Sequence, residues 1–278
     1  MSYETILVHC DASKTAPLRL HVATELAGRF GSRLVGCHAR PPFNAPAFAD
    51  DAYALAPLYE AYEERAKADL VISRTAFDKA IKGKEIKSEW RVVDGNADDE
   101  LIVAARYADL LVVGQSDPDG AMATPPHLPE TVAMAAGRPV LIVPRFGVAK
   151  PPGKVVMLCW NASRESARAA ADALHFLQAA EKVIVLVVDP HESMLGHGAE
   201  PGADAATWLA RNGVKVTVQR EVALDSDVGN LILSRALDYD VDLIVMGVYG
   251  HSRMREFVLG GVTRTLLSSM TVPVLMSH

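Results

Sequence analysis

The chain has 278 residues, of which half are apolar and 22% are charged, and its formal net charge is −6. This length suits one large domain or two of ordinary size, and the acidic balance disfavours nucleic acid and anionic membranes as partners. Three cysteines without a CxxC spacing disfavour a disulfide framework or a zinc ribbon. The apolar runs are too short to cross a membrane and Met1–Thr5 lacks a secretory pattern, so we expect a cytoplasmic protein.

Short apolar runs alternate with longer helical patterns along the first half of the chain. The segment Pro41–Leu58, rich in Pro and Ala, is expected to be a surface loop that precedes a helix near Tyr59–Lys82. Buried parallel strands are almost continuously apolar because both of their faces are covered. On this basis the strands of the first half are Thr5–Cys10, Arg33–Ala39, Lys87–Val93, Asp109–Val113 and Val140–Val143.

The second half follows a segment, Phe146–Lys154, whose two prolines and two glycines indicate a linker. Apolar residues at helical spacing predict a helix over Ser163–Gln178, and a second helix is expected over Gly261–Ser269. Alternation of strands and helices predicts a parallel α/β sheet with right-handed crossovers. The expected strands are Lys154–Cys159, Lys182–Val188, Lys215–Glu221, Leu243–Met246 and Val274–Met276.

The two halves repeat each other, which is the most informative feature of the sequence. Three segments of the first half have counterparts in the second half, in the same order. These pairs predict two domains, 1–145 and 154–278. The pairs are Ile6–Ser13 with Val156–Ser163, Ala108–Gly114 with Val241–Gly247, and Arg138–Val143 with Val272–Met276.

A glycine-rich loop follows the fourth strand of the second half. Two residues separate Gly247 from Gly250, and nine separate Gly250 from Gly260. Gly260 is followed by Gly261, Val262 and Thr263 at the start of a helix. Glycines let a backbone approach a ligand closely, and the free amides of a helix N-terminus attract anions. His251 and Arg253 make the loop locally basic. The pattern indicates a phosphate site, although the same glycines would also serve merely to end a strand and start a helix.

This spacing, G-x2-G-x9-G, resembles the signature of the ATP-binding branch of the universal stress protein family. The resemblance covers both halves and implies two tandem domains of the adenine nucleotide alpha hydrolase-like type. Each would be a five-stranded parallel sheet of order 3-2-1-4-5 with helices on both faces. The resemblance also implies ATP or AMP as ligand, with Mg²⁺ as an optional bridge between phosphates. Pairing of the fifth strands would make the chain an intrachain pseudo-dimer, and a further homodimer is conceivable.

By the same resemblance, ligands bind where the first and fourth strands end. Asn161 and Ala162 would then face the glycine loop, and a backbone contact to adenine would fall near Val187 or Val188. Asn161 stands where the family usually has an aspartate, and Gly261 where it usually has a serine or threonine. We therefore expect nucleotide binding that is weaker than in the family, with no catalytic residue and no protein-held metal.

The first half lacks the glycines of this loop. Asp117 stands where the second half has Gly250, and Pro129 and Glu130 stand near the place of Gly260 and Gly261. A proline removes an amide donor, and the carboxylate of Glu130 would take the place of a phosphate at the helix end. Asp11 is retained at the tip of the first strand. We expect that this half does not bind ATP.

Three functions remain open from the sequence. The first is a stress-response regulator that binds an adenine nucleotide in the C-terminal half, acts on an unknown protein partner and hydrolyses ATP slowly at most. The second is a nucleotide-free tandem scaffold whose glycine loop is a relic. The third, which we weigh lowest, is an enzyme acting on a small metabolite around Asp11, Cys37, His38 and Asp117.

Overall fold

The computed structural model describes residues 3–45, 52–116, 125–190, 199–223, 227–248 and 260–278. The N-terminal half contains five strands and four helices, and the C-terminal half five strands and five helices, within these residues. In chain order the first half consists of β1 (Thr5–His9), α1 (Ala16–Phe30), β2 (Arg33–Arg40), α2 (Ala52–Ile81), β3 (Ser88–Asp94), α3 (Ala97–Ala105), β4 (Leu110–Gly114), α4 (Leu128–Ala135) and β5 (Val140–Val143).

The second half repeats this alternation with shorter helices after its second strand. It consists of β6 (Val155–Cys159), α5 (Arg164–Asp172), α6 (Leu174–Ala179), β7 (Lys182–Val188), α7 (Ala203–Arg211), β8 (Val216–Glu221), α8 (Val228–Asp238), β9 (Leu243–Gly247), α9 (Gly261–Ser269) and β10 (Val274–Ser277).

All ten strands form one sheet, ordered β3-β2-β1-β4-β5-β10-β9-β6-β7-β8. Within each half the strands are parallel and follow the order 3-2-1-4-5, which confirms the fold class predicted from the sequence. The halves join through β5 and β10, which pair antiparallel with Leu141 opposite Leu275. The fifth strands therefore pair within one chain, as the family resemblance implied.

The sheet is covered on both faces, because alternate residues of each strand enter different cores. In β1, Ile6 and Val8 pack on one face while Leu7 packs on the other. The first core receives α1, α2, α5, α6 and α7, and the second receives α3, α4, α8 and α9. The continuously apolar central strands follow from this two-sided burial.

An aromatic cluster ties the two halves together beside the sheet. Tyr3 packs edge to face with His175, and Phe30 packs edge to face with Phe176, each with ring centroids 5.1 Å apart. The rings of Tyr3 and Phe176 are tilted, with centroids 5.6 Å apart. The Tyr3 hydroxyl also donates to the Asp172 carbonyl oxygen at 2.6 Å. Aromatic pairs of this geometry add to the area they bury, so the halves are joined by packing as well as by strand pairing.

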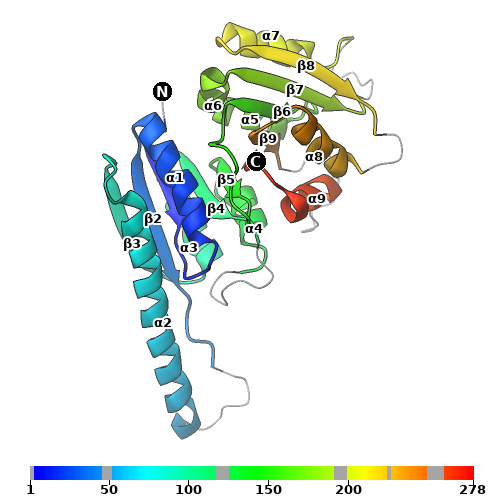
Figure 1. The fold of residues 1–278 in the computed structure, drawn as a ribbon. Helices are drawn as coiled ribbons and strands as arrows, with labels where there is room; N and C mark the ends of the chain where they lie inside the picture. The colour runs from blue at the N-terminus through cyan, green and yellow to red at the C-terminus, as the bar shows by residue number, and fades with distance from the viewer. Residues whose placement is uncertain (1–2, 46–51, 117–124, 191–198, 224–226, 249–259) are drawn as a thin grey trace.

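Two helices differ from the sequence-based expectation. α2 begins at Ala52, so the end of the segment expected to be a loop is helical, and Figure 1 shows the first turns of α2 projecting beyond the sheet. The single helix expected over Ser163–Gln178 is two helices that meet at Ala173.

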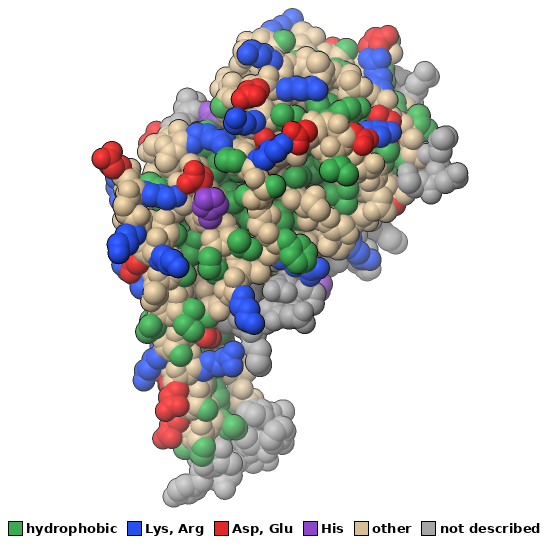
Figure 2. Space-filling view, in the orientation of Figure 1, with side chains coloured by type: hydrophobic (Ala, Val, Ile, Leu, Met, Phe, Trp, Pro, Cys, Tyr) green, Lys and Arg blue, Asp and Glu red, His purple; other side chains and the backbone are tan. Residues whose placement is uncertain are grey.

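Charged side chains of both signs are interspersed over the face seen in Figure 2, between hydrophobic ones. Among the described helices, none combines the length and apolar character that crossing a membrane requires.

Candidate functional site

A cleft of about 310 Å³ opens in the C-terminal half where β6 and β9 end. These two strands are neighbours in the sheet, and their connections leave in opposite directions, which is where open α/β sheets bind ligands. The cleft is lined by Cys159, Trp160, Asn161, Leu186, Val188, Val228, Ile232, Met246, Gly247, Gly260, Gly261, Val262 and Thr263.

The polar side of the cleft is the N-terminus of α9. Gly260 is its N-cap and provides no side-chain cap, and the first backbone bond of the helix runs from Arg264 N to Gly260 O at 3.1 Å. The amides of the first three helical residues have no acceptor within a helix, and none of the described residues supplies one. Three amide donors and the positive end of the helix dipole therefore face the cleft.

The glycines at this helix end leave room for a ligand. Gly260 and Gly261 are exposed, and no described atom lies within 4 Å of the place where a Cβ would be. Thr263, two residues further on, is buried with 4% of its surface exposed, and it lines the cleft. Its hydroxyl is a donor at the same helix end.

Gly247 permits close packing of two elements, whereas Gly260 and Gly261 leave room for a ligand. A Cβ at this position would lie 2.5 Å from the carbonyl carbon of Glu165 and 2.6 Å from the Ser166 nitrogen. Only glycine lets α5 come this close to the end of β9. The approach is held by Ser163, whose hydroxyl caps α5 by accepting from the Ser166 amide at 3.1 Å.

The tip of β6 contributes Asn161, whose side chain is exposed at the cleft. Its Oδ1 accepts a hydrogen bond from the Ser163 amide at 3.2 Å, which leaves the two donors of its amide nitrogen available to a ligand. Ala162 has a left-handed backbone with φ of 54° and does not line the cleft. Trp160 forms part of the wall, and it packs against the core under α5, α6 and α7.

Val187 does not face the cleft, although its neighbours do. Its side chain is fully buried in the core under α5, α6 and α7, while Leu186 and Val188 line the cleft from the other face of β7. The apolar wall is completed by Val228 and Ile232 of α8 and by Met246. Sequence reasoning missed these three residues, because no local pattern distinguishes an apolar residue that lines a cleft from one in the core.

Of the other residues predicted for this site, Gly250, His251 and Arg253 lie outside the described residues, and so does Asp117 of the first half. The residues that the structure brings together are Asn161, Gly247, Gly260, Gly261, Val262 and Thr263. Among the described residues, no group of three or more His, Cys, Asp or Glu side chains is arranged to hold a metal ion.

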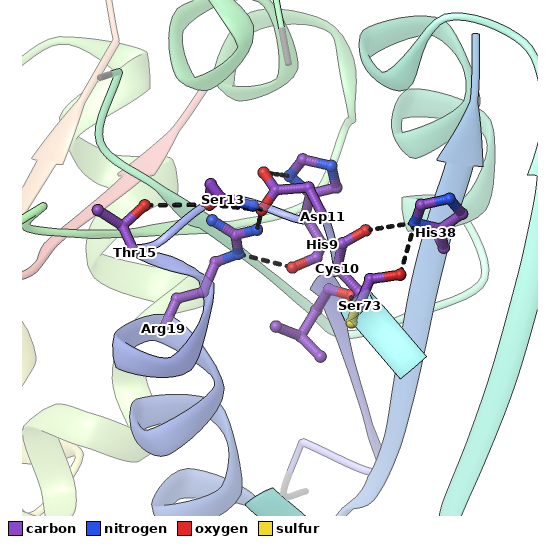
Figure 3. A network of polar contacts seen from close by, with 9 residues as sticks. His9, Cys10, Asp11, Ser13, Thr15, Arg19, His38 and Ser73 are labelled. Carbon is purple, nitrogen blue, oxygen red and sulfur yellow. Dashed lines mark hydrogen bonds and ion pairs between the residues drawn. The ribbon is translucent and has the colours of Figure 1, made fainter. Parts of the chain in front are cut away.

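The corresponding place in the N-terminal half is occupied by a buried ion pair (Figure 3). Asp11 at the tip of β1 and Arg19 of α1 are 4% and 3% exposed, and Arg19 Nη2 lies 2.6 Å from Asp11 Oδ1. Arg19 also donates from Nε to the His9 carbonyl oxygen at 2.7 Å. A Cβ on Gly114 at the end of β4 would be 3.0 Å from the guanidinium, so Arg19 lies between the tips of β1 and β4.

Asp11 has further partners in this network. Its Oδ1 accepts from the Ser13 amide at 2.9 Å and from the Ser13 hydroxyl at 2.5 Å, and its Oδ2 lies 3.8 Å from His9 Nδ1. His9 is buried, and burial lowers its pKa to about 4 despite the raising effect of Asp11. The ring is therefore neutral at pH 7 and Arg19 is the cation that compensates Asp11.

The helix that matches α9 in the N-terminal half begins before the residues expected from the sequence. α4 begins at Leu128 with His127 as its N-cap, so His127, rather than Pro129, holds the place of Gly260. Pro129 and Glu130 are the second and third helical residues, so the first turn still lacks one amide donor and carries one carboxyl group. Burial raises the pKa of the Glu130 carboxyl against the lowering effect of its own backbone amide, so the carboxylate lies at this helix end.

A family model described as the universal stress protein family matches residues 2–144 and again residues 153–278. A universal stress protein from Archaeoglobus fulgidus DSM 4304 is similar in structure, with a TM-score of 0.73 and 16% identity over 98% of this chain and 95% of that chain. A functionally unknown protein from Pseudomonas aeruginosa PAO1 has a TM-score of 0.58 and 16% identity over 99% of this chain and 92% of that chain. At these identities the structural likeness establishes the fold alone. No curated protein shows significant sequence similarity.

Proposed function

Because the chain belongs to the universal stress protein family, we propose that it is a stress-response regulator whose C-terminal half binds an adenine nucleotide, ATP or AMP. The observation that carries the proposal is the N-terminus of α9, where three backbone amides face a cleft without an acceptor from the described residues. Free amides at a helix N-terminus are the chemistry that proteins use for phosphate.

Each side of the cleft suits one part of the ligand. The amides of Gly261, Val262 and Thr263 would donate to phosphate oxygens, and the Asn161 amide would donate to a ribose hydroxyl. The apolar wall, which includes Val188, Ile232 and Met246, would pack against the base. When ATP is bound, Mg²⁺ would neutralise its phosphates, and we propose that it is held mainly through the phosphate oxygens.

Binding rather than turnover is the proposed activity, with slow ATP hydrolysis at most. The regulatory effect requires a partner protein that binds the free and nucleotide-bound states with different affinities. We propose the cytoplasm as the place where this occurs. A homodimer of the whole chain would be an additional assembly, beyond the pairing of β5 with β10.

The test removes one amide from α9 and leaves the helix intact. Gly261→Pro deletes the first helical amide at a position where proline is well tolerated. Gly261→Ala keeps the amide and adds a methyl group that has no described atom within 4 Å. A hydrogen bond to a charged group contributes about 1.5–3 kcal/mol, so the proline variant should bind ATP about 10- to 100-fold more weakly by isothermal titration calorimetry. The alanine variant should stay within about threefold of the wild type.

The alternative function is a nucleotide-free scaffold, which is favoured by the continuous ten-stranded sheet that holds both halves as one platform. Native mass spectrometry of protein purified without added nucleotide separates the two functions. A retained adenine nucleotide supports the regulator. Absence of nucleotide, together with no heat of binding at millimolar ATP or AMP with or without Mg²⁺, would leave the scaffold as the better description.

A further inference from the structure

A second cavity lies in the N-terminal half and is independent of the nucleotide cleft. It has a volume of about 340 Å³ and opens where β2 ends beside the projecting helix α2. Pockets for small molecules commonly begin near this size. The helix α2 belongs to the core on the opposite face of the sheet from α8 and α9, so this cavity and the nucleotide cleft use different faces.

The elements that surround this cavity differ in the second half. Its corresponding helix, α7, has nine residues where α2 has thirty. The pairing of His9 with Cys37 and of Cys159 with Leu186 places Val187 where the first half has His38. The longer helix and the histidine in place of a valine therefore distinguish the surroundings of this cavity from the matching place in the described part of the second half.

His38 supplies a buried hydrogen-bond acceptor. Only 4% of its surface is exposed, and its Nδ1 lies 3.1 Å from the Cys10 carbonyl oxygen and 2.9 Å from Ser73 Oγ. A carbonyl oxygen can only accept, which assigns the proton to Nδ1 and leaves a lone pair on Nε2 of the neutral ring. Figure 3 shows this second nitrogen turned away from Cys10 and Ser73, and the residue lines the cavity.

Asp69 of α2 supplies a second acceptor, and this one is charged. Its side chain is 20% exposed, and its Oδ2 is 3.8 Å from Arg65 Nε. A direct hydrogen bond is shorter than this. The pair Arg74 and Asp78, with the same spacing on the same helix, meets at 2.8 Å. Within the described part of the chain, the Asp69 carboxylate therefore has hydrogen-bonding capacity that Arg65 does not use.

The mouth of the cavity has the opposite charge, and its wall is apolar. Arg65 also lines the cavity and its side chain is 63% exposed, so the guanidinium lies nearer to solvent than Asp69 and His38. The rings of Phe43 and Tyr62 pack with their centroids 5.5 Å apart, and the Tyr62 hydroxyl donates to the Pro41 carbonyl oxygen. The cavity thus presents two acceptors inside, an aromatic wall and Arg65 at the entrance, while a second arginine of the lining, Arg40, is paired with Asp94 at 2.7 Å.

We propose that this cavity binds a free α-amino acid with an apolar side chain. The ammonium group donates to His38 Nε2 and to the Asp69 carboxylate, the carboxylate of the ligand faces Arg65, and the apolar side chain packs against Phe43 and Tyr62. An amino acid carries its ammonium and carboxylate groups on the same α-carbon, which suits an Asp69 carboxylate and an Arg65 guanidinium whose Oδ2 and Nε atoms lie 3.8 Å apart.

The first test varies the ligand against the full-length protein. L-phenylalanine and L-leucine are titrated by calorimetry, beside N-acetyl-L-phenylalanine, which lacks the ammonium, and phenethylamine, which lacks the carboxylate. The free amino acids should bind, and each analogue should bind at least about tenfold more weakly, because each leaves one buried or charged group unpaired. Failure of both amino acids to bind at millimolar concentration overturns the proposal, and so does equal binding of the acetylated analogue.

The second test varies the protein. Asp69→Asn keeps the shape of the side chain and removes its charge, and it should weaken L-phenylalanine binding about tenfold. Asp78→Asn is the matched control on the same helix, and it should leave binding unchanged because Asp78 does not line the cavity. Gly261→Pro should also leave it unchanged. Equal affinities of Asp69→Asn and the wild type would refute the assigned site.

Discussion

The two halves of the molecule share one strand order but differ in the burial and charge of the residues at the tip of their first strand. In the first half Asp11 is buried against Arg19 at 2.6 Å. In the second half Asn161 is exposed at a cleft, and the residue ten positions after Cys159, matching Arg19 ten positions after His9, is Ala169. The fold depends on strand pairing and on the two cores, which both halves keep, whereas the ligand chemistry depends on a few side chains at the strand ends.

The difference also shows two ways of satisfying the polar groups at the tip of a strand. In the first half the guanidinium of Arg19, between β1 and β4, pairs with Asp11 from within the protein. The second half has a neutral asparagine and the free amides of α9 instead, and these donors are available to hydrogen-bond water or a nucleotide. Three experiments test this contrast, beginning with the one of largest effect.

Arg19→Ala should be the most damaging single change in the comparison. It leaves the carboxylate of Asp11 buried without its cation, and removing one partner of a buried ion pair costs about 3–5 kcal/mol. The double variant Arg19→Ala/Asp11→Asn copies Ala169 and Asn161 of the second half, and it should recover much of that loss. Urea unfolding followed by circular dichroism measures both; equal destabilisation of the single and double variants would contradict the role given to the ion pair.

Gln115→Ala should weaken the contact between the two halves and lower the free energy of unfolding. This residue follows β4 and is 7% exposed; its Nε2 donates to the carbonyl oxygens of Leu267 at 2.8 Å and Ser268 at 3.2 Å in the other half. Its Oε1 accepts from the Arg145 amide at 3.0 Å. Losing these three bonds should lower the free energy of unfolding by about 2 kcal/mol.

The matched control for Gln115 is Gln178, which is exposed and donates to the Asn212 carbonyl oxygen at 2.9 Å within its own half. Gln178→Ala should change the free energy of unfolding by less than about 0.5 kcal/mol. If the two variants behaved alike in thermal unfolding, Gln115 would not be a connection between the halves.

Lowering the pH should destabilise the protein through His9, the buried histidine of the first half. The pKa of His9 is about 4 in the folded protein because of burial, whereas an unfolded histidine titrates near 6.5. Between these values the unfolded state binds more protons, so stability is complete above about pH 6.5 and falls as the pH drops toward 4. The loss attributable to His9 should be about 1–2 kcal/mol at pH 5.

The measurement compares urea midpoints of the wild type and of His9→Gln at pH 7.5 and pH 5. The variant has no imidazole at this position, so its loss of stability between the two conditions should be smaller than that of the wild type. An identical loss in both proteins would show that His9 is not the group responsible.

Much of the fold followed from the sequence because the central strands are buried on both faces. Val140–Val143 and Lys182–Val188 coincide with β5 and β7, and Gly261–Ser269 coincides with α9, since a glycine pair marks its start. The start of α2 was wrong because Pro57 reads as a loop residue, although it lies inside the helix. Its missing amide costs one backbone hydrogen bond, which the rest of a 30-residue helix tolerates.

The site was predictable only where chain order determines it. The glycine loop and Asn161 were expected to come together because both follow adjacent parallel strands, and the structure places Gly260, Gly261 and Asn161 around one cleft. Arg19 was overlooked, since periodicity does not distinguish a buried arginine from a solvated one; its only signal is its place among apolar residues of α1. The cavity beside His38 depends on the long-range contact of β2 with α2, which no local pattern contains.

The antiparallel pairing of β5 with β10 should not depend on the protein concentration. In a dimer of separate chains, such a ladder forms and dissociates by mass action, and dilution exposes two strand edges. Here both strands belong to one polypeptide, so their encounter is intramolecular, and its effective concentration is set by the segment between β5 and β6 that joins the two halves. The protected edge, and the relative placement of the two dissimilar pockets, should therefore be the same in a dilute cell extract as in a concentrated solution.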